Sequence, residues 1–133
     1  MSNTSHAAAL RYYRDSGTAA VACDASPHRL VTMLYDGVIE RLGRGVSSLA
    51  AGDIVGKVRA VNSAMEVISY LRAILDFQAG GDLARQFDSL YDYMLRRLTQ
   101  ANAANDPEGL REVARLVNTL KSGWEQIPES MRG

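Results

Sequence analysis

The sequence predicts an all-α fold: an antiparallel up-down-up-down four-helix bundle that follows a mobile N-terminal arm. Apolar residues recur at spacings of three and four along four long stretches, which is the period of an α-helix. Helix-starting pairs, Ser26-Pro27 and Asp106-Pro107, precede the first and last stretch. Glycines at Gly52 and Gly80-Gly81 separate the others, so the connections are short. Four helices of similar length joined in this way can bury their apolar faces together only as an antiparallel bundle.

Composition restricts the class of protein. The chain has 133 residues with 47% hydrophobic content, enough for one domain with a core that needs no disulfide or metal. Fifteen basic and fifteen acidic residues give no net charge, which disfavours nucleic acid as a partner. Cys23 is the only cysteine, which fits a reducing compartment. The sequence shows neither a signal peptide nor a membrane-spanning run, so we expect a cytoplasmic protein without membrane insertion.

The first 24 residues differ in composition from the rest, so we expect an arm at 1–24 and a bundle domain at 25–133. The arm is rich in Ala and Ser, Gly17 interrupts it, and only its short stretch 7–14 could add an extra helix. Tyr12 and Tyr13 are aromatic residues in an otherwise small and polar segment, and their rings would be buried if they docked on the bundle. They could occlude a groove of the bundle until a partner displaces them, or they could belong to a disordered tail.

The first helix is expected from Pro27 to about Ala50, with Ser26 as its cap. Its apolar face is broader than one neighbouring helix would bury, so part of it is expected to serve another contact. The residues of this face are Leu30, Val31, Met33, Leu34, Tyr35, Val38, Ile39 and Leu42.

The second helix is expected from Ile54 to about Phe77, capped by Asp53 and ended by Gly80-Gly81. Its core stripe is expected to contain Ile54, Val58, Val61, Met65, Ile68 and Leu75. A second apolar row on the opposite side contains Val67, Tyr70, Ile74 and Phe77. Either the helix is central and touches neighbours on both sides, or the second row is an exposed groove for an amphipathic helix of another chain.

The third and fourth helices complete the predicted bundle. The third is expected to begin at Asp82 and to end before the polar stretch 102–105, and its core stripe holds Leu83, Phe87, Leu90, Tyr91, Met94 and Leu98. The fourth starts at Asp106-Pro107 and is expected to end near Pro128. Its stripe holds Leu110, Val113, Val117, Leu120, Trp124 and Ile127.

The residues that could carry catalysis or bind a metal are few, so we expect no enzyme, no cofactor and no metal. His6 lies in the arm and His28 in a first helical turn, and no base and nucleophile pair is visible. The Glu-x-x-His units of bundle di-metal sites are absent from the sequence. Asp88 and Asp92 are one turn apart and could share a cation in a small metal-dependent enzyme, although a solvated helix face is the simpler interpretation.

Several motifs together resemble the flagellar secretion chaperone family FliS, over residues 13 to about 127. They are ASPHRLVTMLYDG at 25–37, Gly52-Asp53, LRAILDF at 71–77 followed by Gly80-Gly81, LYDYMLRRL at 90–98, and Asn105-Asp106-Pro107. The resemblance implies a cytoplasmic chaperone that binds the C-terminal segment of flagellin, prevents premature polymerisation and assists type III export. It further implies contacts with the export gate and with flagellar regulatory proteins.

Candidate flagellin-binding residues follow from the two apolar faces and the resemblance. They are Leu34, Tyr35, Val67, Tyr70, Leu71, Ile74, Phe77 and Tyr93. The family's N-terminal tyrosine, which covers part of the binding surface, matches Tyr13 best, with Tyr12 as the other choice. The main competing hypothesis is a homodimeric structural or regulatory bundle without flagellin cargo, and the free chain is expected to be a monomer or a homodimer.

Overall fold

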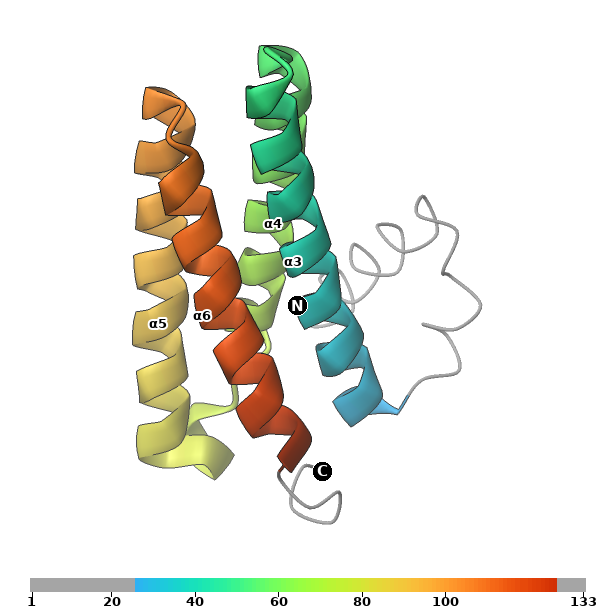
Figure 1. The fold of residues 1–133 in the computed structure, drawn as a ribbon. Coiled ribbons are helices and arrows are strands. Elements are labelled where there is room, and N and C mark those ends of the chain that lie inside the picture. The colour runs from blue at the N-terminus through green and yellow to red at the C-terminus, as the bar shows by residue number, and fades with distance from the viewer. Residues whose placement is uncertain (1–25, 127–133) are drawn as a thin grey trace.

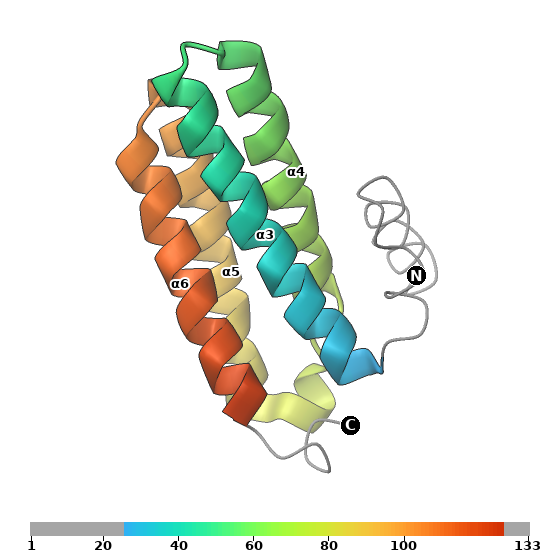
Figure 2. The same ribbon diagram turned by 45° about the vertical axis from the view of Figure 1, so that its right-hand side comes forward.

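A computed structural model describes residues 26–126, and the regular structure in this range is entirely helical, as predicted. Figures 1 and 2 show α3 (Pro27–Ala50), α4 (Ile54–Ala73), α5 (Phe77–Ala104) and α6 (Pro107–Gln126) running alternately up and down as a bundle. Each of α3 and α5 packs against both α4 and α6. The pairs α3 and α5, and α4 and α6, therefore face each other across the diagonals.

The arm expected at 1–24, with Tyr12 and Tyr13, lies outside the described residues, as does the predicted end of the last helix at Ile127 and Pro128. No helix between residues 26 and 126 combines the length and hydropathy that crossing a membrane requires.

Three predicted helix starts are confirmed, each by a side chain that accepts a backbone hydrogen bond. Ser26 accepts from the N–H of Arg29 at the start of α3, and Asp53 accepts from Gly56 at the start of α4. Asp106 accepts from the N–H of Glu108 at the start of α6. These bonds satisfy N–H groups that have no partner inside the helix, so the starts are fixed by the local sequence.

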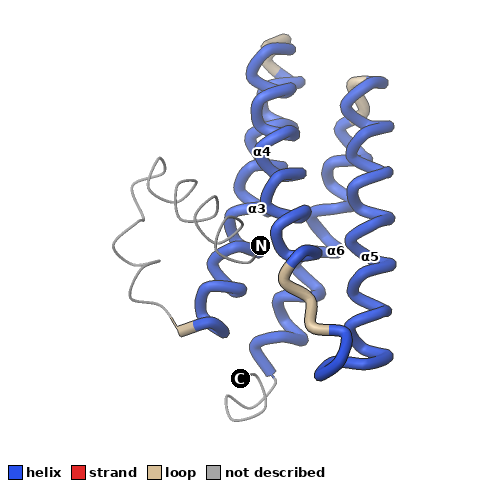
Figure 3. The backbone as a smooth tube through the Cα atoms, turned by 180° about the vertical axis from the view of Figure 1, so that it is seen from behind, coloured by secondary structure: helices blue, strands red, loops and turns tan. Residues whose placement is uncertain are grey.

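The predicted break between the second and third helices was wrong by several residues. Here α4 ends at Ala73 and α5 begins at Phe77, whereas the prediction placed Phe77 in the second helix and the next start at Asp82. The side chain of Asp76 accepts from the N–H groups of Gln78 and Ala79 and so starts a new helix. The tan segment between α4 and α5 in Figure 3 is this connection.

The core stripe predicted for the second helix is correct at Val61 and Ile68, which are fully buried, and wrong at its start. Ile54 and Val58 are exposed, at 46% and 36%. Because α4 packs against both α3 and α5, its buried face differs from the predicted core stripe. It includes smaller side chains, and it includes Val67 from the second apolar row, which the prediction placed on the opposite side of the helix. That face consists of Lys57, Ala60, Val61, Ala64, Val67, Ile68 and Leu71.

Lys57 occupies a core position, where its ammonium group donates hydrogen bonds to two oxygens of Asn102. Its side chain is only 2% exposed, and its Nζ donates to the backbone oxygen and to Oδ1 of Asn102, both at 2.7 Å. Asn102 lies in the last turn of α5, where backbone carbonyls lack helical partners and a positive charge is favoured. Lys57 therefore joins the start of α4 to the end of α5.

The end of the bundle that holds Lys57 is tightly packed. An alanine Cβ at Gly45 of α3 would lie 3.1 Å from Leu110 Cδ1 of α6, and one at Gly109 would lie 2.5 Å from the Cβ of Ala101. Asn105 adopts the left-handed conformation that ends α5 and allows α6 to start two residues later. Glycines at these contacts let the helices approach closely.

Replacing Lys57 with methionine tests the joint between α4 and α5. We expect Lys57→Met to lower the free energy of unfolding by about 1–3 kcal/mol, because the half-buried Oδ1 and backbone oxygen of Asn102 lose the hydrogen bonds of the ammonium group. Urea denaturation measures this loss, and Arg59→Met at an exposed position of α4 is the control. Equal stabilities of the two variants would contradict the assigned role of Lys57.

Candidate functional site

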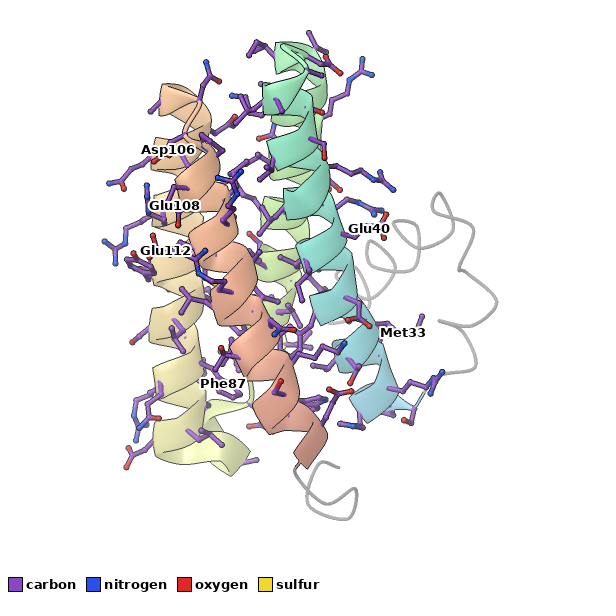
Figure 4. The ribbon with its side chains drawn as sticks, viewed as in Figure 1. Met33, Glu40, Phe87, Asp106, Glu108 and Glu112 are labelled. Carbon is purple, nitrogen blue, oxygen red and sulfur yellow. The ribbon has the colours of Figure 1, made fainter. Side chains whose placement is uncertain are left out.

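A pocket of about 350 Å³ opens at the end of the bundle where α3 begins, α4 connects to α5 and α6 ends. It is shaped by the short α4–α5 connection, which carries α5 away from α4 before the two helices pack together. Figure 4 labels one of its residues, Phe87, in the lower half of α5. The lining residues are mostly apolar: Val31, Tyr35, Leu71, Ile74, Leu75, Asp76, Ala79, Gly80, Leu83, Ala84, Phe87, Tyr91 and Trp124.

Two tyrosines on diagonal helices form the inner wall of the pocket. The hydroxyls of Tyr35 on α3 and Tyr91 on α5 are 2.7 Å apart and hydrogen-bonded, and both side chains are buried. Burial raises the pKa of Tyr91 far above its ordinary value, and the nearby Tyr35 hydroxyl adds to this rise. Burial likewise raises the pKa of Tyr35, although its hydrogen bond with Tyr91 acts in the opposite direction. Both phenols therefore stay neutral at physiological pH.

The side of the pocket formed by α3 and α6 is held by polar contacts. The indole Nε1 of Trp124 donates to the backbone oxygen of His28 at 3.1 Å, and the two rings stack with centroids 5.0 Å apart. One helical turn away, Lys121 pairs with Asp36 at 2.6 Å, which raises the pKa of the Lys121 ammonium. These contacts fix α6 against the start of α3.

Three large apolar side chains are exposed at the pocket end of the bundle, and two of them line the pocket. Ile74, Phe77 and Leu83 are 38%, 45% and 51% exposed. Ile74 and Leu83 line the pocket, and Phe77 begins the helix that forms one wall. Grouped apolar exposure of this kind on a protein surface marks a site of interaction.

The structure brings three of the eight predicted binding residues together. Tyr35, Leu71 and Ile74 all line the pocket, and Phe77 lies beside it. Phe77 does so from α5 and not from the second helix as predicted. Tyr70, half-buried on α4, is one turn before Ile74 and continues the same side of the helix.

Of the two interpretations of the second row of α4, the central helix holds at Val67, and Leu34, another predicted binding residue, is also a core residue. Val67 is 4% exposed and Leu34 is fully buried, and both belong to the hydrophobic core. The physical reason is that α4 and α3 each pack against two neighbours, so a broad apolar face is used inside the bundle. Neither side chain can contact a partner while the bundle is closed.

Tyr93, the remaining predicted residue, lies on α5 away from the pocket. It is 37% exposed and donates a hydrogen bond to Glu112 of α6, which Figure 4 labels on the side of α6 toward α5. This bond raises the pKa of Tyr93 and, together with Arg97, lowers that of Glu112. Arg97 also pairs with Asp106, so this polar cluster fixes α5 to α6.

Ten of the thirteen lining residues were not predicted as site residues. The large apolar and aromatic ones among them had been assigned to apolar helix faces without a separate role: Val31, Leu75, Leu83, Phe87, Tyr91 and Trp124. For Leu83 and Phe87 a signal existed in Gly80-Gly81, because a helix interrupted there cannot keep its next residues in the same core stripe.

The two carboxylates considered as a cation site are paired with arginines. Arg72 of α4 bonds Asp88 at 2.7 Å and Asp92 at 3.2 Å, and Arg96 bonds Asp92 at 2.9 Å. The hydrogen bond from Arg96 holds the pKa of Asp92 below its usual value. Between residues 26 and 126 no group of three or more metal-ligating His, Cys, Asp or Glu side chains occurs. The cluster serves to join α4 to α5.

A second hollow lies between α4 and α5 at the opposite end of the bundle, lined by Lys57, Val58, Asn62, Met65, Thr99, Asn102 and Ala103. It is more open than the first pocket, and polar residues make up more of its lining. Its floor is closed by the hydrogen bonds of Lys57 to Asn102. The pocket at the α4–α5 connection is therefore the better candidate site.

Comparisons with known proteins agree on one family. A family model described as the flagellar protein FliS matches residues 9–131. The chain is similar to the flagellar secretion chaperone FliS of Vibrio cholerae, at 40% identity over 90% of this chain and 88% of that relative. It is also similar to FliS of Salmonella typhimurium, at 38% identity over 91% and 90%. FliSB of Pseudomonas aeruginosa, another flagellar secretion chaperone, is 39% identical over 90% and 94%.

Phenylalanine substitutions test the role of the tyrosine pair. We expect Tyr35→Phe or Tyr91→Phe alone to lower the free energy of unfolding by about 1–3 kcal/mol, because each leaves one buried hydroxyl without its partner. The double variant should lose less than the sum of the two. Denaturant unfolding of the wild type, the two single variants and the double variant gives the coupling free energy of the two hydroxyls. Strictly additive losses would show that the two hydroxyls are not coupled.

Proposed function

The chain belongs to the FliS family of flagellar secretion chaperones, and from that premise we propose that it binds the C-terminal segment of flagellin in the cytoplasm. Binding would keep flagellin from polymerising early and would assist its type III export. The family is one of chaperones and not of enzymes, so the proposed action is non-covalent.

The observation that carries this proposal is the apolar pocket with its exposed rim. Ile74, Phe77 and Leu83 are exposed at the end of the bundle that opens into a hollow whose walls are mostly apolar. An amphipathic segment with apolar residues at spacings of three, four and seven would place them in such a hollow. A flagellin segment that folds as a helix on this surface would lose the apolar exposure that drives polymerisation.

We assign the first contacts to the pocket end of the bundle. Ile74 and Phe77 present the accessible apolar surface, while Leu71 and Tyr35 form the walls that an inserted side chain would reach. Tyr70 continues this surface along α4. Coupled folding costs several kcal/mol of ordering, so a segment longer than one helical turn is needed. Delivery to the export gate and contact with regulatory proteins would then use other surfaces.

Calorimetric titration with the C-terminal segment of flagellin from the same organism tests the proposed function. We expect saturable binding with a negative heat-capacity change, because apolar surface is buried as the segment folds. Repeating the titration at several temperatures measures that change. Absence of binding by a verified soluble segment, together with a concentration-dependent dimer in sedimentation, would favour the homodimeric bundle instead.

Two variants locate the contact within the same titration. Ile74→Asp should weaken binding about tenfold or more, since it removes an apolar contact and buries a charge. Its fold should survive because the side chain is already partly exposed. Ser69→Asp, exposed on the same helix, adds the same charge without removing apolar surface and should bind like the wild type. Equal binding by both variants would contradict the pocket assignment.

The N-terminal arm is proposed to cover the pocket in the free protein through Tyr12 or Tyr13. Removing residues 1–14 should then speed cargo association, because the open state becomes more populated. Stopped-flow mixing measures the association rate, and removal of residues 1–9 alone, which keeps both tyrosines, is the control. An association rate that does not change on removal of residues 1–14 would reject occlusion.

A further inference from the structure

One wall of the pocket is separated from the rest of its helix by an unusual backbone conformation. Gly81 inside α5 has φ +52° and ψ −125°, which is accessible to glycine and strained for other residues. It divides α5 into a single turn that begins at Phe77 and the long part that packs in the bundle. Figures 1 and 2 show the turn lying across the lower end of the bundle and not along the axis of α5.

The hydrogen bonds of this turn are all local among the described residues. The carboxylate of Asp76 accepts from Gln78 and Ala79, and the N–H of Gly80 donates to the backbone oxygen of Asp76 at 2.8 Å. On the far side of the hinge, Asp82 pairs with Arg85, again within α5. We find no hydrogen bond or ion pair from residues 77–83 to α3 or α6 in the part of the chain that the structure describes.

The other walls are fixed by polar contacts between helices. Tyr35 and Tyr91 bond across the diagonal, and Trp124 bonds and stacks with His28. These bonds set the positions of α3, α6 and the long part of α5. Among the described residues, the wall at residues 77–83 has no such polar contact with α3 or α6, and the side chains at its two ends, Phe77 and Leu83, are half exposed.

We propose that residues 77–80, which we term the α5 cover, pivot at Gly81 and adjust the width of the pocket to the apolar side chains of an inserted amphipathic helix. This inference rests on the proposed function, because the inserted helix is the flagellin segment. As the cover closes, Phe77 transfers from solvent onto the occupant, which also contacts Leu83 at the start of the long part of α5. The apolar surface that is exposed in the free protein is thereby used to hold the cargo.

Distances between spin labels test the pivot without any cargo. Both label pairs are made in a Cys23→Ser background. The first pair, Gln78→Cys with Asn118→Cys, measures the distance from the cover to α6. The control pair, Gln100→Cys with Asn118→Cys, measures the distance from the long part of α5 to α6. We expect the first pair to give a distance distribution about twofold broader than the control, and to narrow when cargo binds. Equal widths in the free protein would overturn the pivot.

A matched glycine pair tests the functional consequence. Gly81 and Gly52 both have positive φ, and a Cβ added at either would meet open space, but Gly52 lies in the α3–α4 turn at the other end of the bundle. Gly81→Ala and Gly52→Ala should lower Tm comparably, while only Gly81→Ala should weaken cargo binding, by about tenfold. Equal affinities of the two variants would overturn the proposal. Failure of the wild type to bind cargo would instead reject the proposed function. The pivot would then be tested only by the spin-label distances in the free protein.

Discussion

A hydrogen bond between two buried tyrosines is the interaction on which the shape of this bundle depends. Tyr35 and Tyr91 come from α3 and α5, which face each other across a diagonal, and their hydroxyls meet in the core. Neither ring can withdraw without leaving a buried hydroxyl unpaired. The combined length of the two side chains therefore sets the separation of α3 and α5 at this level. On one side of the pair the core is filled by aliphatic residues, and on the other side the bundle opens into the pocket.

The two ends of the bundle are built differently. At the end away from the pocket, Lys57 joins α4 to α5, Arg97 joins α5 to α6, and glycines let the backbones approach closely. At the pocket end, Trp124 and Lys121 join α6 to α3, and the α4–α5 connection is held by local bonds around Asp76. The difference between the two ends therefore lies in the α4–α5 connection and in the pocket that opens beside it.

Local chemistry made most of the fold predictable, while features that depend on neighbouring helices were not. The cap at Ser26 and the spacing that follows it predict α3 to its last residue. The start of α5 was missed because Asp76 lies inside an apolar run whose period continues that of α4. The pocket was predicted through Ile74 but not through Phe87 or Trp124, since a helical stripe looks the same whether it faces a core or an opening. The opening is lined by residues of all four helices, and sequence spacing does not reveal which of them meet there.

The position of Trp124 gives the molecule a reporter of its own. It is the only tryptophan of the chain, and it lines the pocket while its ring stacks on His28. The intrinsic tryptophan fluorescence of the whole protein therefore originates at one wall of this site. An occupant that excludes water from the indole would shift its emission to shorter wavelength, and a charged imidazolium of His28 would quench it. The filling of the pocket can thus be followed optically in the unlabelled protein.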